Sequence, residues 1–284
     1  MATQSYRGLT PLRGLAASYR KEIAGYEAAF FVLHAQLFAA AVLSMGFTAA
    51  AANDIVDTNN TSHGYVTVNY TSSAKLKVGI QYNGGTTVYR DCPSGKDASF
   101  SLDQGDGKYT VTLYRNVSGS SYEEVSSKTM NVTVKDRFAP YLVSTSDIQF
   151  SKGDAVSAKA AELCKNAKTD EEKVVAIYNY MADRYSYDYE LANEITSGKI
   201  TKYIPDTAAT LNGTTGMCYD FSSLFAAMCR SEGIPCALTK GYAGSSYHAW
   251  NKVNLNGKWY QIDLTYAVTR SVKTQKPCMT VYLR

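Results

Sequence analysis

The stretch that decides the fold runs from Gly216 to Thr265 and opens Gly-Met-Cys-Tyr-Asp-Phe-Ser-Ser-Leu-Phe-Ala-Ala-Met-Cys-Arg. Its apolar residues recur with the spacing i, i+3, i+4 and i+7, which is typical of one buried helix face. They are Phe221, Leu224, Phe225 and Met228. Cys218 is therefore expected in or just before the first helical turn, where unpaired N–H groups and the helix dipole favour a thiolate. Gly233-Ile234-Pro235 is expected to end the helix, because glycine accepts a left-handed conformation and proline cannot continue the ladder.

The second part of the stretch predicts antiparallel strands. A first strand is expected over Ala237–Tyr242, followed by a loop over 243–246. Two further runs, Tyr247–Leu255 and Lys258–Leu264, flank Asn256-Gly257. Because an Asn-Gly pair between two strand-like runs is a strong hairpin signal, these runs are expected to pair with each other.

The register of this hairpin decides whether His248 and Asp263 can meet. If Asn256-Gly257 forms the whole loop, Asp263 lies opposite Trp250 and diagonal to His248 on the same face. A four-residue loop over 254–257 places His248 directly opposite Asp263 instead. Both registers bring imidazole and carboxylate within reach, whereas a shift by one residue would put them on opposite faces.

In these residues the chain resembles the transglutaminase-like superfamily, whose fold is related to that of papain-type cysteine proteases. Members carry a Gly-x-Cys motif at a helix N-terminus, a His-Ala-Trp strand and an Asp-x-Thr strand. The corresponding residues here are Gly216–Cys218, His248–Trp250 and Asp263–Thr265. The chain departs from the pattern at Leu264, where members commonly have proline. The resemblance covers residues 174–266 and implies an α+β core, in which the helix bearing the nucleophile packs on an antiparallel sheet.

The resemblance implies a catalytic triad of Cys218, His248 and Asp263. His248 takes the thiol proton or holds it in a thiolate–imidazolium pair, and Asp263 accepts from the other ring nitrogen and fixes the tautomer. The thiolate attacks an amide or ester carbonyl, with the backbone N–H of Cys218 as one oxyanion donor. Further candidates for the oxyanion hole or the substrate groove are Tyr203, Asn212, Trp250 and Tyr187.

The cysteine and histidine content gives no reason to expect a cofactor or a metal. No Cys-x-x-Cys pair occurs, and one of the three histidines lies near the cysteines, so a structural zinc site is not expected. The chain has six cysteines, Cys92, Cys164, Cys218, Cys229, Cys236 and Cys278. If Cys218 is the nucleophile, the remaining odd number cannot all pair, so we expect mostly free, buried thiols with at most one or two disulfides.

The N-terminal part predicts export. Residues 28–53 contain no charged side chain and hold an apolar block, which basic residues precede and Ala49–Ala52 follow. We interpret residues 1–52 as a signal peptide cleaved near Ala52, or as a membrane anchor, since the block is long enough to span a bilayer. A buried core helix is the remaining interpretation. The protein is therefore expected to be secreted or at the cell surface, with a membrane contact only if this segment is retained.

After a polar linker over 53–64, short runs separated by turn-forming residues predict an all-β domain over 65–136. The expected strands are Tyr65–Tyr70, Ala74–Tyr82, Thr86–Arg90, Ala98–Leu102, Lys108–Arg115 and Lys128–Lys135. Regular short strands of this kind suggest an immunoglobulin-like sandwich. The region holds no constellation of catalytic residues, so we interpret it as a spacer or packing module.

Residues 141–284 are expected to form the catalytic domain. Helical periodicity begins at Asp154, and Thr169-Asp170-Glu171-Glu172 is a capping box that starts a second helix. The polar stretch 191–215 is expected to be a loop with one short helix near Ala208–Leu211. The segment 272–283 is expected to supply one more strand.

Composition and charge narrow the class of function. The chain has 284 residues, 45% hydrophobic, 19% charged, with a net charge of +4 and no lysine or arginine run, so a globular protein is expected and nucleic acid is not an expected partner. The expected function is acyl transfer on a peptide or protein, with cell-wall peptides among the candidates. Water as acceptor would give a hydrolase and an amine would give a transferase. The alternative is a catalytically inactive cell-surface binding or scaffold protein that keeps the fold.

Overall fold

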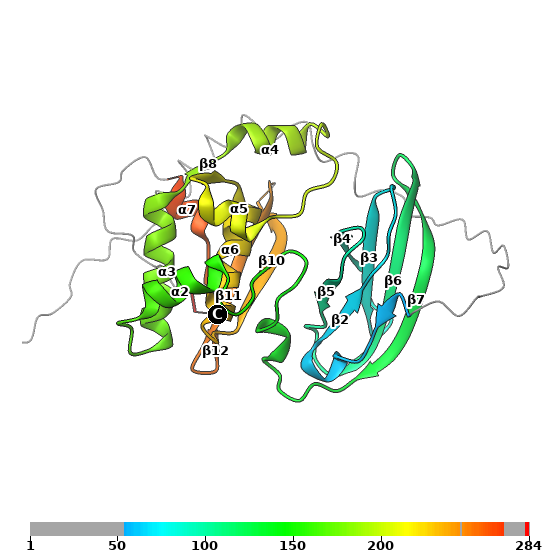
Figure 1. Ribbon diagram of the computed structural model, residues 1–284, viewed down its shortest axis with the longest axis horizontal. Coiled ribbons are helices and arrows are strands. Elements are labelled where there is room, and N and C mark those ends of the chain that lie inside the picture. Colours follow the sequence, from blue (N-terminus) through cyan, green and yellow to red (C-terminus); the bar gives the residue numbers. More distant parts are fainter. Residues whose placement is uncertain (1–53, 245, 270–281, 284) are drawn as a thin grey trace, which may run out of the picture.

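The computed structural model describes residues 54–244, 246–269 and 282–283. They form an all-β unit and an α+β unit, which lie side by side on the right and left of Figure 1. The expected signal peptide or anchor, residues 1–52, and Cys278 lie outside the described residues.

The all-β unit has two antiparallel sheets that share one apolar core. The smaller sheet has the order β1-β2-β5, with β1 (Val56–Asp57), β2 (Tyr65–Val68) and β5 (Ala98–Ser101). The larger has the order β4-β3-β6-β7, with β3 (Leu76–Tyr82), β4 (Val88–Cys92), β6 (Gly107–Ser118) and β7 (Ser121–Val132). Val66 and Phe100 of one sheet and Val78 and Val111 of the other belong to the same buried cluster. The immunoglobulin-like assignment of this two-layered unit stays a prediction.

Two expectations about this unit need correction. Within the expected linker, β1 pairs with β2 and a short 3-10 helix, η1 (Thr61–His63), follows, so strand pairing begins before residue 65. The expected strand Lys128–Lys135 is the end of a longer one: β7 starts at Ser121 and forms a long hairpin with β6. The first part of β7 was not predicted, because most of its side chains are polar and at least partly exposed, so the sequence shows no clear alternation of apolar residues there.

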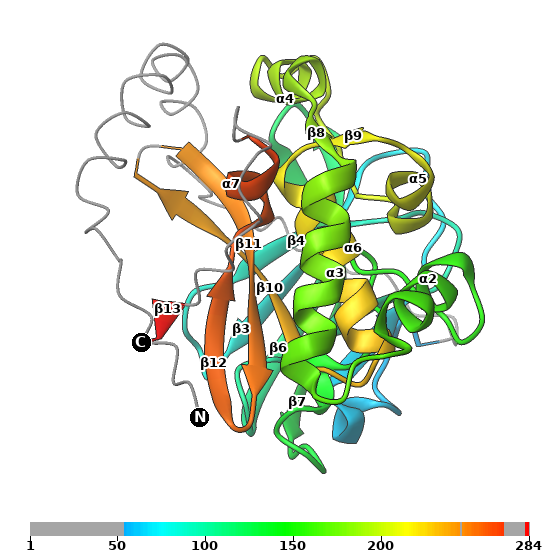
Figure 2. The ribbon, with the colours of Figure 1, turned by 90° about the vertical axis from the view of Figure 1, so that its left-hand side faces the viewer.

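The α+β unit places one helix between a helical layer and a sheet. The helices are α2 (Ala155–Cys164), α3 (Asp170–Arg184), α4 (Tyr189–Thr196), α5 (Thr207–Asn212), α6 (Cys218–Ser231) and α7 (Leu264–Val268). The sheet has the order β10-β11-β12-β13, with β10 (Cys236–Ala243), β11 (Ser246–Leu255), β12 (Lys258–Ile262) and β13 (Tyr282–Leu283). A parallel pair, β8 (Ser186–Tyr187) and β9 (Thr215–Gly216), lies beside the start of α6. In Figure 2, α3 stands in front of α6 and the sheet.

Helix α6 is the centre of the second core. The predicted face, Phe221, Leu224, Phe225 and Met228, is fully buried. The sequence pattern predicted one buried face, but every residue from Asp220 to Arg230 is buried. The reason is that α2, α3 and α5 contact the helix on some sides while β10 and β11 contact it on another.

Helix caps explain most of the remaining boundaries. The Asp154 carboxylate accepts from the Ser157 N–H at 2.8 Å, and the Thr169 hydroxyl accepts from the Glu172 N–H at 3.1 Å, as the capping patterns predict. The expected loop over 191–215 is wrong at its start, because α4 continues to Thr196. The Asp188 side chain caps this helix by accepting from the Leu191 N–H at 2.9 Å.

The hairpin follows the two-residue register. Leu255 pairs with Lys258, and Asn256 and Gly257 have φ angles of 52° and 81°, as a type I′ turn requires. Extending this ladder by one pair beyond Asn251–Ile262 puts Asp263 opposite Trp250 and diagonal to His248. The expected strand to Leu264 is too long, since β12 ends at Ile262 and Asp263 caps α7.

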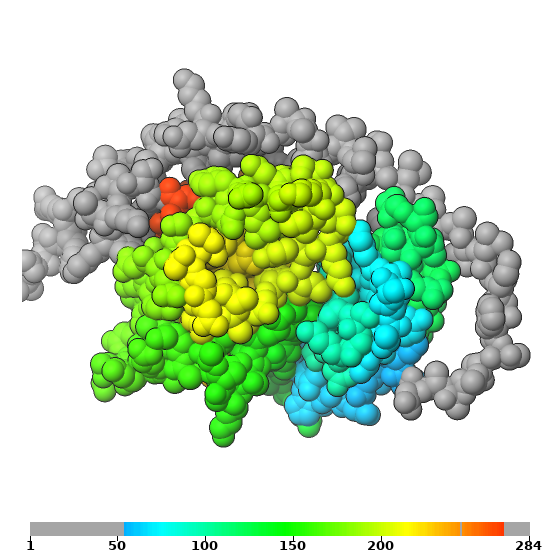
Figure 3. Space-filling model, turned by 45° about the horizontal axis from the view of Figure 1, so that its top comes forward, coloured from blue at the N-terminus to red at the C-terminus, as the bar shows by residue number. Residues whose placement is uncertain are grey.

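The two units contact each other through the segment that joins them. The Ser146 N–H donates to the Ser99 carbonyl at 2.9 Å, and the Tyr141 hydroxyl donates to the Asp103 carbonyl at 2.8 Å. Lys75 of the sandwich also donates to Thr201 in the loop after α4. In Figure 3 the blue to teal sandwich abuts this yellow-green loop, and the surface is hollowed between α4 and the yellow segment of α5.

Among the described helices, none combines the length and the hydropathy that a membrane crossing needs.

Candidate active site

Cys218 is the first residue of α6 and is partly exposed. The start of the helix is fixed by Asp220, whose Oδ2 accepts from the Met217 N–H at 2.9 Å. The first N–H groups of an α-helix have no partner within the helix. The thiol of Cys218 therefore lies at a helix end whose backbone donors and dipole favour negative charge.

His248 stands between Cys218 and Asp263. Its Nε2 lies 2.8 Å from Oδ2 of Asp263, and Cys218 is among the groups that raise the pKa of its ring. Because Nε2 is engaged with the carboxylate, Nδ1 is the nitrogen left for the thiol. The three predicted triad residues thus come together from α6, β11 and the β12–α7 junction.

The surroundings of His248 favour its protonated form. Burial by itself disfavours the imidazolium, but hydrogen bonds with Asp263 and Cys218 and the negative charge that each can carry outweigh burial and raise the pKa to about 10. Asp263 is held in place by a second contact, since its Oδ1 accepts from the Thr265 N–H at 3.0 Å. The arrangement can hold a proton on the imidazole beside a thiolate.

Tyr203 supports the helix that bears Cys218. Its hydroxyl donates to Oδ1 of Asp220 at 2.7 Å, while the other carboxylate oxygen caps Met217. Burial and the nearby Asp220 carboxylate raise the pKa of Tyr203, so its proton stays on the hydroxyl. Since this single proton is engaged by Asp220, the structure gives Tyr203 a positioning role rather than that of a free oxyanion donor.

The other predicted groove residues occupy different places. Tyr187 pairs with Gly216 in the β8–β9 ladder, and its ring lies 6.4 Å from that of Phe221, so it borders the start of α6. Trp250 stacks beside His248 with ring centroids 6.1 Å apart and forms a wall next to the imidazole. Asn212 is exposed at the end of α5, where its backbone carbonyl accepts from Arg184 at 3.5 Å. No contact within the described residues joins its side chain to the triad.

A buried polar cluster beside the nucleophile was missed from the sequence. Asp147 accepts from the Tyr219 hydroxyl at 3.1 Å and lies 3.7 Å from both Arg90 and Lys240. Lys240 in turn donates to the Tyr219 hydroxyl at 2.8 Å. Burial raises the pKa of Asp147, but Arg90, then Lys240 and the hydrogen bonds, lower it to about 2. The cluster ties the sandwich, the joining segment and the sheet to the residue after Cys218.

No local sequence signal marks this cluster. Arg90 belongs to β4, Asp147 to the joining segment, Tyr219 to α6 and Lys240 to β10, so no two members are close in sequence. A charged residue such as Arg90 inside a strand pattern is usually solvated, and its burial here follows from the packing of the α+β unit against the sandwich.

Exposed aromatic side chains lie near the triad. Tyr242 and Tyr247 are each 58% exposed, and their rings contact each other at 5.6 Å across the β10–β11 hairpin. Tyr247 directly precedes His248 in β11, so the two side chains leave the strand on opposite faces. Exposed aromatic groups of this kind provide apolar contact area for a ligand.

The described residues show no group of three or more His, Cys, Asp and Glu side chains arranged to hold a metal ion. The five described cysteines are free, and four of them are buried while Cys218 is partly exposed. Burial raises the pKa of Cys164 to about 11 and raises that of Cys229 well above its ordinary value. Of these thiols, Cys218 is the one placed beside an imidazole.

Comparisons with known proteins match the part of the chain that contains Cys218, His248 and Asp263. Residues 157–264 match the family model of the transglutaminase-like superfamily. The kyphoscoliosis peptidases of Mus musculus and Homo sapiens are both 31% identical over 118 residues, which is 37% of this chain and 17% of theirs. The match therefore spans less than a fifth of the length of these relatives.

Two solved structures were found with a partly similar course of the chain. A candidate cysteine protease from Cytophaga hutchinsonii is 20% identical, with 72% of this chain and 73% of that one covered and a TM-score of 0.40. A structure named as a TGase is 23% identical, with 58% and 46% covered and a TM-score of 0.34.

Proposed function

We propose that this protein is a thiol enzyme that transfers the acyl group of a peptide or protein amide through Cys218, His248 and Asp263. The bond between His248 and Asp263, together with the place of Cys218 at the start of α6, carries the proposal. A nucleophile beside a base that a third group orients is the arrangement that covalent acyl transfer needs. The transglutaminase-like match of residues 157–264 supports the same assignment.

The first half-reaction forms a thioester. The Cys218 sulfur attacks the carbonyl carbon, and the carbonyl oxygen becomes an oxyanion that the N–H groups at the start of α6 stabilise. As the tetrahedral intermediate collapses, the C–N bond breaks and the leaving amine takes a proton from His248. Asp263 keeps the ring oriented and stabilises the imidazolium.

The second half-reaction releases the acyl group from sulfur. His248 removes a proton from the acceptor, whose oxygen or nitrogen attacks the thioester carbonyl. As the C–S bond breaks, its electron pair goes to the Cys218 sulfur, and the proton on His248 restores the thiolate–imidazolium pair. Water as acceptor makes the protein a protease or amidase, and an amine makes it a transferase. Both outcomes use the same acyl-enzyme.

We further propose that the protein acts outside the cell or at its surface, with cell-wall peptides among its candidate substrates. The apolar segment within residues 28–53 motivates the location. The sandwich, for which an immunoglobulin-like fold remains the prediction, would serve to position the catalytic unit. The exposed Tyr242 and Tyr247 on the β10–β11 hairpin offer apolar contact area to a substrate.

The decisive experiment compares the wild-type chain with Cys218→Ala. Turnover of a fluorogenic peptide library reports hydrolysis, and incorporation of a dansylated alkylamine into casein reports transfer. Cys164→Ala is a matched control, because it removes a buried thiol from the same unit. We expect Cys218→Ala to lose both activities with an unchanged thermal melt, and Cys164→Ala to keep its activity per folded molecule.

The alternative is a scaffold that keeps the fold without catalysis. It predicts no turnover and a Cys218 thiol no more reactive than Cys229 in the folded protein. Full activity in Cys218→Ala would refute the proposed nucleophile.

A further inference from the structure

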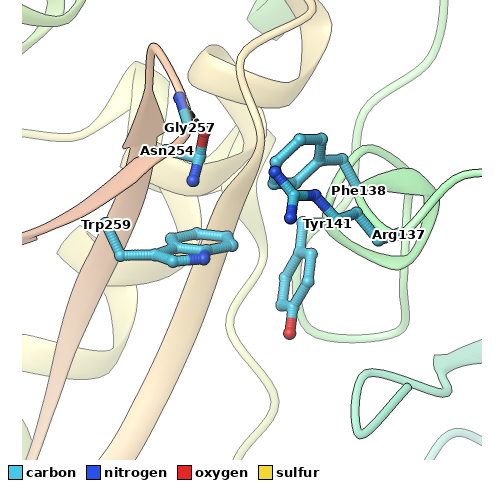
Figure 4. A pocket seen from close by; sticks show the side chains of 6 residues that line it. All are labelled: Arg137, Phe138, Tyr141, Asn254, Gly257 and Trp259. Atoms are coloured by element: carbon cyan, nitrogen blue, oxygen red, sulfur yellow. Dashed lines mark hydrogen bonds between the residues drawn. The ribbon is translucent and has the colours of Figure 1, made fainter.

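A second concave site lies at the other end of β11 from the triad. It is a pocket of about 250 Å³ lined by Arg137, Phe138, Tyr141, Asn254, Gly257 and Trp259. Figure 4 shows the rings of Phe138 and Tyr141, from the joining segment, across from Trp259 of the β11–β12 hairpin. The site therefore forms where the segment that leaves the sandwich meets the sheet.

Three aromatic rings that contact one another line one side of this pocket. The Trp259 ring is 4.8 Å from that of Tyr141 and 6.3 Å from that of Phe138, both in edge-to-face orientation. The Tyr141 hydroxyl donates to the Asp103 carbonyl at 2.8 Å, which holds its ring in place. Because the rings contact one another, they form one continuous aromatic surface, against which a flat or apolar group can pack.

Asn254 places a free hydrogen-bond donor in this pocket. It is 6% exposed, and its Oδ1 accepts from the Gly257 N–H at 3.1 Å. This bond fixes which end of the amide is the nitrogen, and Nδ2 has no acceptor within the described residues. In Figure 4 this nitrogen points from the turn towards Trp259. A buried donor without an acceptor is uncommon, and an acceptor from a ligand would satisfy it.

Arg137 adds a positive charge at the mouth. Its side chain is exposed, and its guanidinium carbon lies 4.6 Å from the centre of the Phe138 ring. Arginine in this position can offer two parallel N–H groups to a carboxylate while it remains stacked on the ring. Among the described residues that line the pocket, none has an acidic side chain. The free polar groups of the pocket are therefore donors.

We propose that this pocket binds the C-terminal residue of a peptide that ends in an apolar or aromatic side chain. The carboxylate accepts from Arg137 and from Nδ2 of Asn254, and the side chain packs against the aromatic surface of Trp259, Tyr141 and Phe138. The volume is below the range of pockets that hold drug-sized ligands, so it suits one residue rather than a larger molecule. The rest of the peptide leaves through the mouth beside Arg137.

The site is separate from the triad. His248 and Asn254 are six positions apart on β11, at the two ends of the strand. With a rise of about 3.3 Å per residue, they lie about 20 Å apart along the strand. Binding at this pocket therefore does not depend on Cys218, and the inference goes beyond the proposed acyl transfer.

The test uses the full chain with Cys218→Ala, so that the probes are not turned over. The probes are acetyl-Gly-Gly-Phe with a free carboxylate, the same peptide as its C-terminal amide, and acetyl-Gly-Gly-Gly with a free carboxylate. Calorimetry gives the dissociation constants. The indole N–H signal of Trp259 in a proton–nitrogen spectrum, assigned with Trp259→Phe, locates the binding site. The chain has two tryptophans, so this signal is easily resolved.

Each polar contact has its own variant. Arg137→Gln removes the exposed cation, and Asn254→Asp keeps the acceptor for the Gly257 N–H while replacing the free donor by a charge that repels a carboxylate. Arg115→Gln is the matched control, because Arg115 is an arginine on β6 that pairs with Glu123 and does not line the pocket. Arg137 is exposed, so its variant remains informative even if Asn254→Asp fails to fold.

We expect saturable binding of acetyl-Gly-Gly-Phe that shifts the Trp259 signal. Amidation should weaken it about tenfold, as should Arg137→Gln and Asn254→Asp, because each removes a charge-assisted hydrogen bond. Acetyl-Gly-Gly-Gly should bind more weakly, because its C-terminal glycine has no side chain to pack against the aromatic rings. Arg115→Gln should leave the dissociation constant unchanged. Equal affinity for acid and amide, binding that Arg137→Gln leaves unchanged, or no saturable binding at millimolar concentrations would each overturn the proposal.

Discussion

The hydroxyl of Tyr219 donates to the Asp147 carboxylate at 3.1 Å, and through this contact the residue after Cys218 is joined to the segment between the two units. Asp147 is 3% exposed and also faces Arg90 from the sandwich and Lys240 from β10. The first turn of α6 and the strand beside β11 are thus fixed to one buried carboxylate. The relative placement of Cys218 and His248 depends on it, although Asp147 touches neither.

Replacing Asp147 by Asn should destabilise the protein by about 3 kcal/mol, because the buried positive charges of Arg90 and Lys240 both lose the carboxylate that neutralises them. Urea unfolding measures this change. Asp91→Asn is the control, since Asp91 pairs with Lys77 at 2.9 Å with both side chains partly exposed, and its loss should cost at most about 1 kcal/mol. Equal losses in the two variants would mean that the cluster has no special role in stability.

We expect the protein to lose stability in acid as the Asp147 carboxylate becomes protonated. Its pKa in the folded protein is about 2, below the ordinary value of 3.8, so the stabilisation is present above pH about 3.8 and is lost as pH falls through about 2. The shift corresponds to about 2 kcal/mol. Unfolding free energies measured between pH 5 and pH 2, where the fold allows, should fall more steeply in the wild type than in Asp147→Asn. Parallel curves would contradict the assignment.

Cys218 should alkylate faster than the other described cysteines in the folded protein. It is partly exposed beside His248, whereas Cys92, Cys164, Cys229 and Cys236 are buried. Iodoacetamide labelling read by peptide mass spectrometry should show Cys218 modified first, with the others labelled after unfolding. In His248→Ala, labelling of Cys218 at neutral pH should become slower, because the histidine no longer takes the thiol proton. An unchanged labelling rate would show that the histidine does not activate the thiol.

Asp263→Asn should lower the pKa of His248 from about 10, because the hydrogen bond and the charge of Asp263 contribute to raising it. The contribution of the protonated ring to stability is full below pH about 6.5 and is lost as pH rises through about 10, so in the variant it should be lost at a lower pH. Titration of the His248 ring protons by NMR measures the change. Thr265→Ala is a control that keeps the carboxylate and the backbone N–H it accepts from. A His248 titration that Asp263→Asn leaves unchanged would rule out the coupling.

Tyr203→Phe should reduce stability by about 1–2 kcal/mol, because one buried oxygen of Asp220 loses its donor. The carboxylate keeps its bond from Met217, so the helix should still begin at Cys218. Thermal or urea unfolding measures the change, with Tyr189→Phe as control because that ring is 65% exposed. If Tyr203 were instead a direct oxyanion donor, its variant would lose turnover at unchanged stability.

The local elements near the triad could be predicted because their signals are local. The i, i+3, i+4, i+7 pattern from Phe221 and the Gly233-Ile234-Pro235 end give α6, and Asn256-Gly257 gives the hairpin and a register parity that puts His248 and Asp263 on one face. Helix α4 was missed although Leu191, Ala192 and Ile195 follow a helical spacing, because the helix has only eight residues and an aspartate such as Asp188 is common in loops as well as at helix caps.

Caps, turns and periodicity act between residues close in the chain, so they were enough to predict the helix that bears Cys218 and the strand that bears His248. They did not predict that Asp263 lies beyond its strand and caps α7. The tertiary structure alone decided that α6 is buried on all sides, that the Tyr203 hydroxyl is engaged by Asp220, and that Arg90 and Asp147 meet beside Tyr219. It also decided that Arg137 and Asn254 line one pocket. These are contacts between distant segments, and whether a polar side chain is solvated or buried among partners depends on how the layers pack.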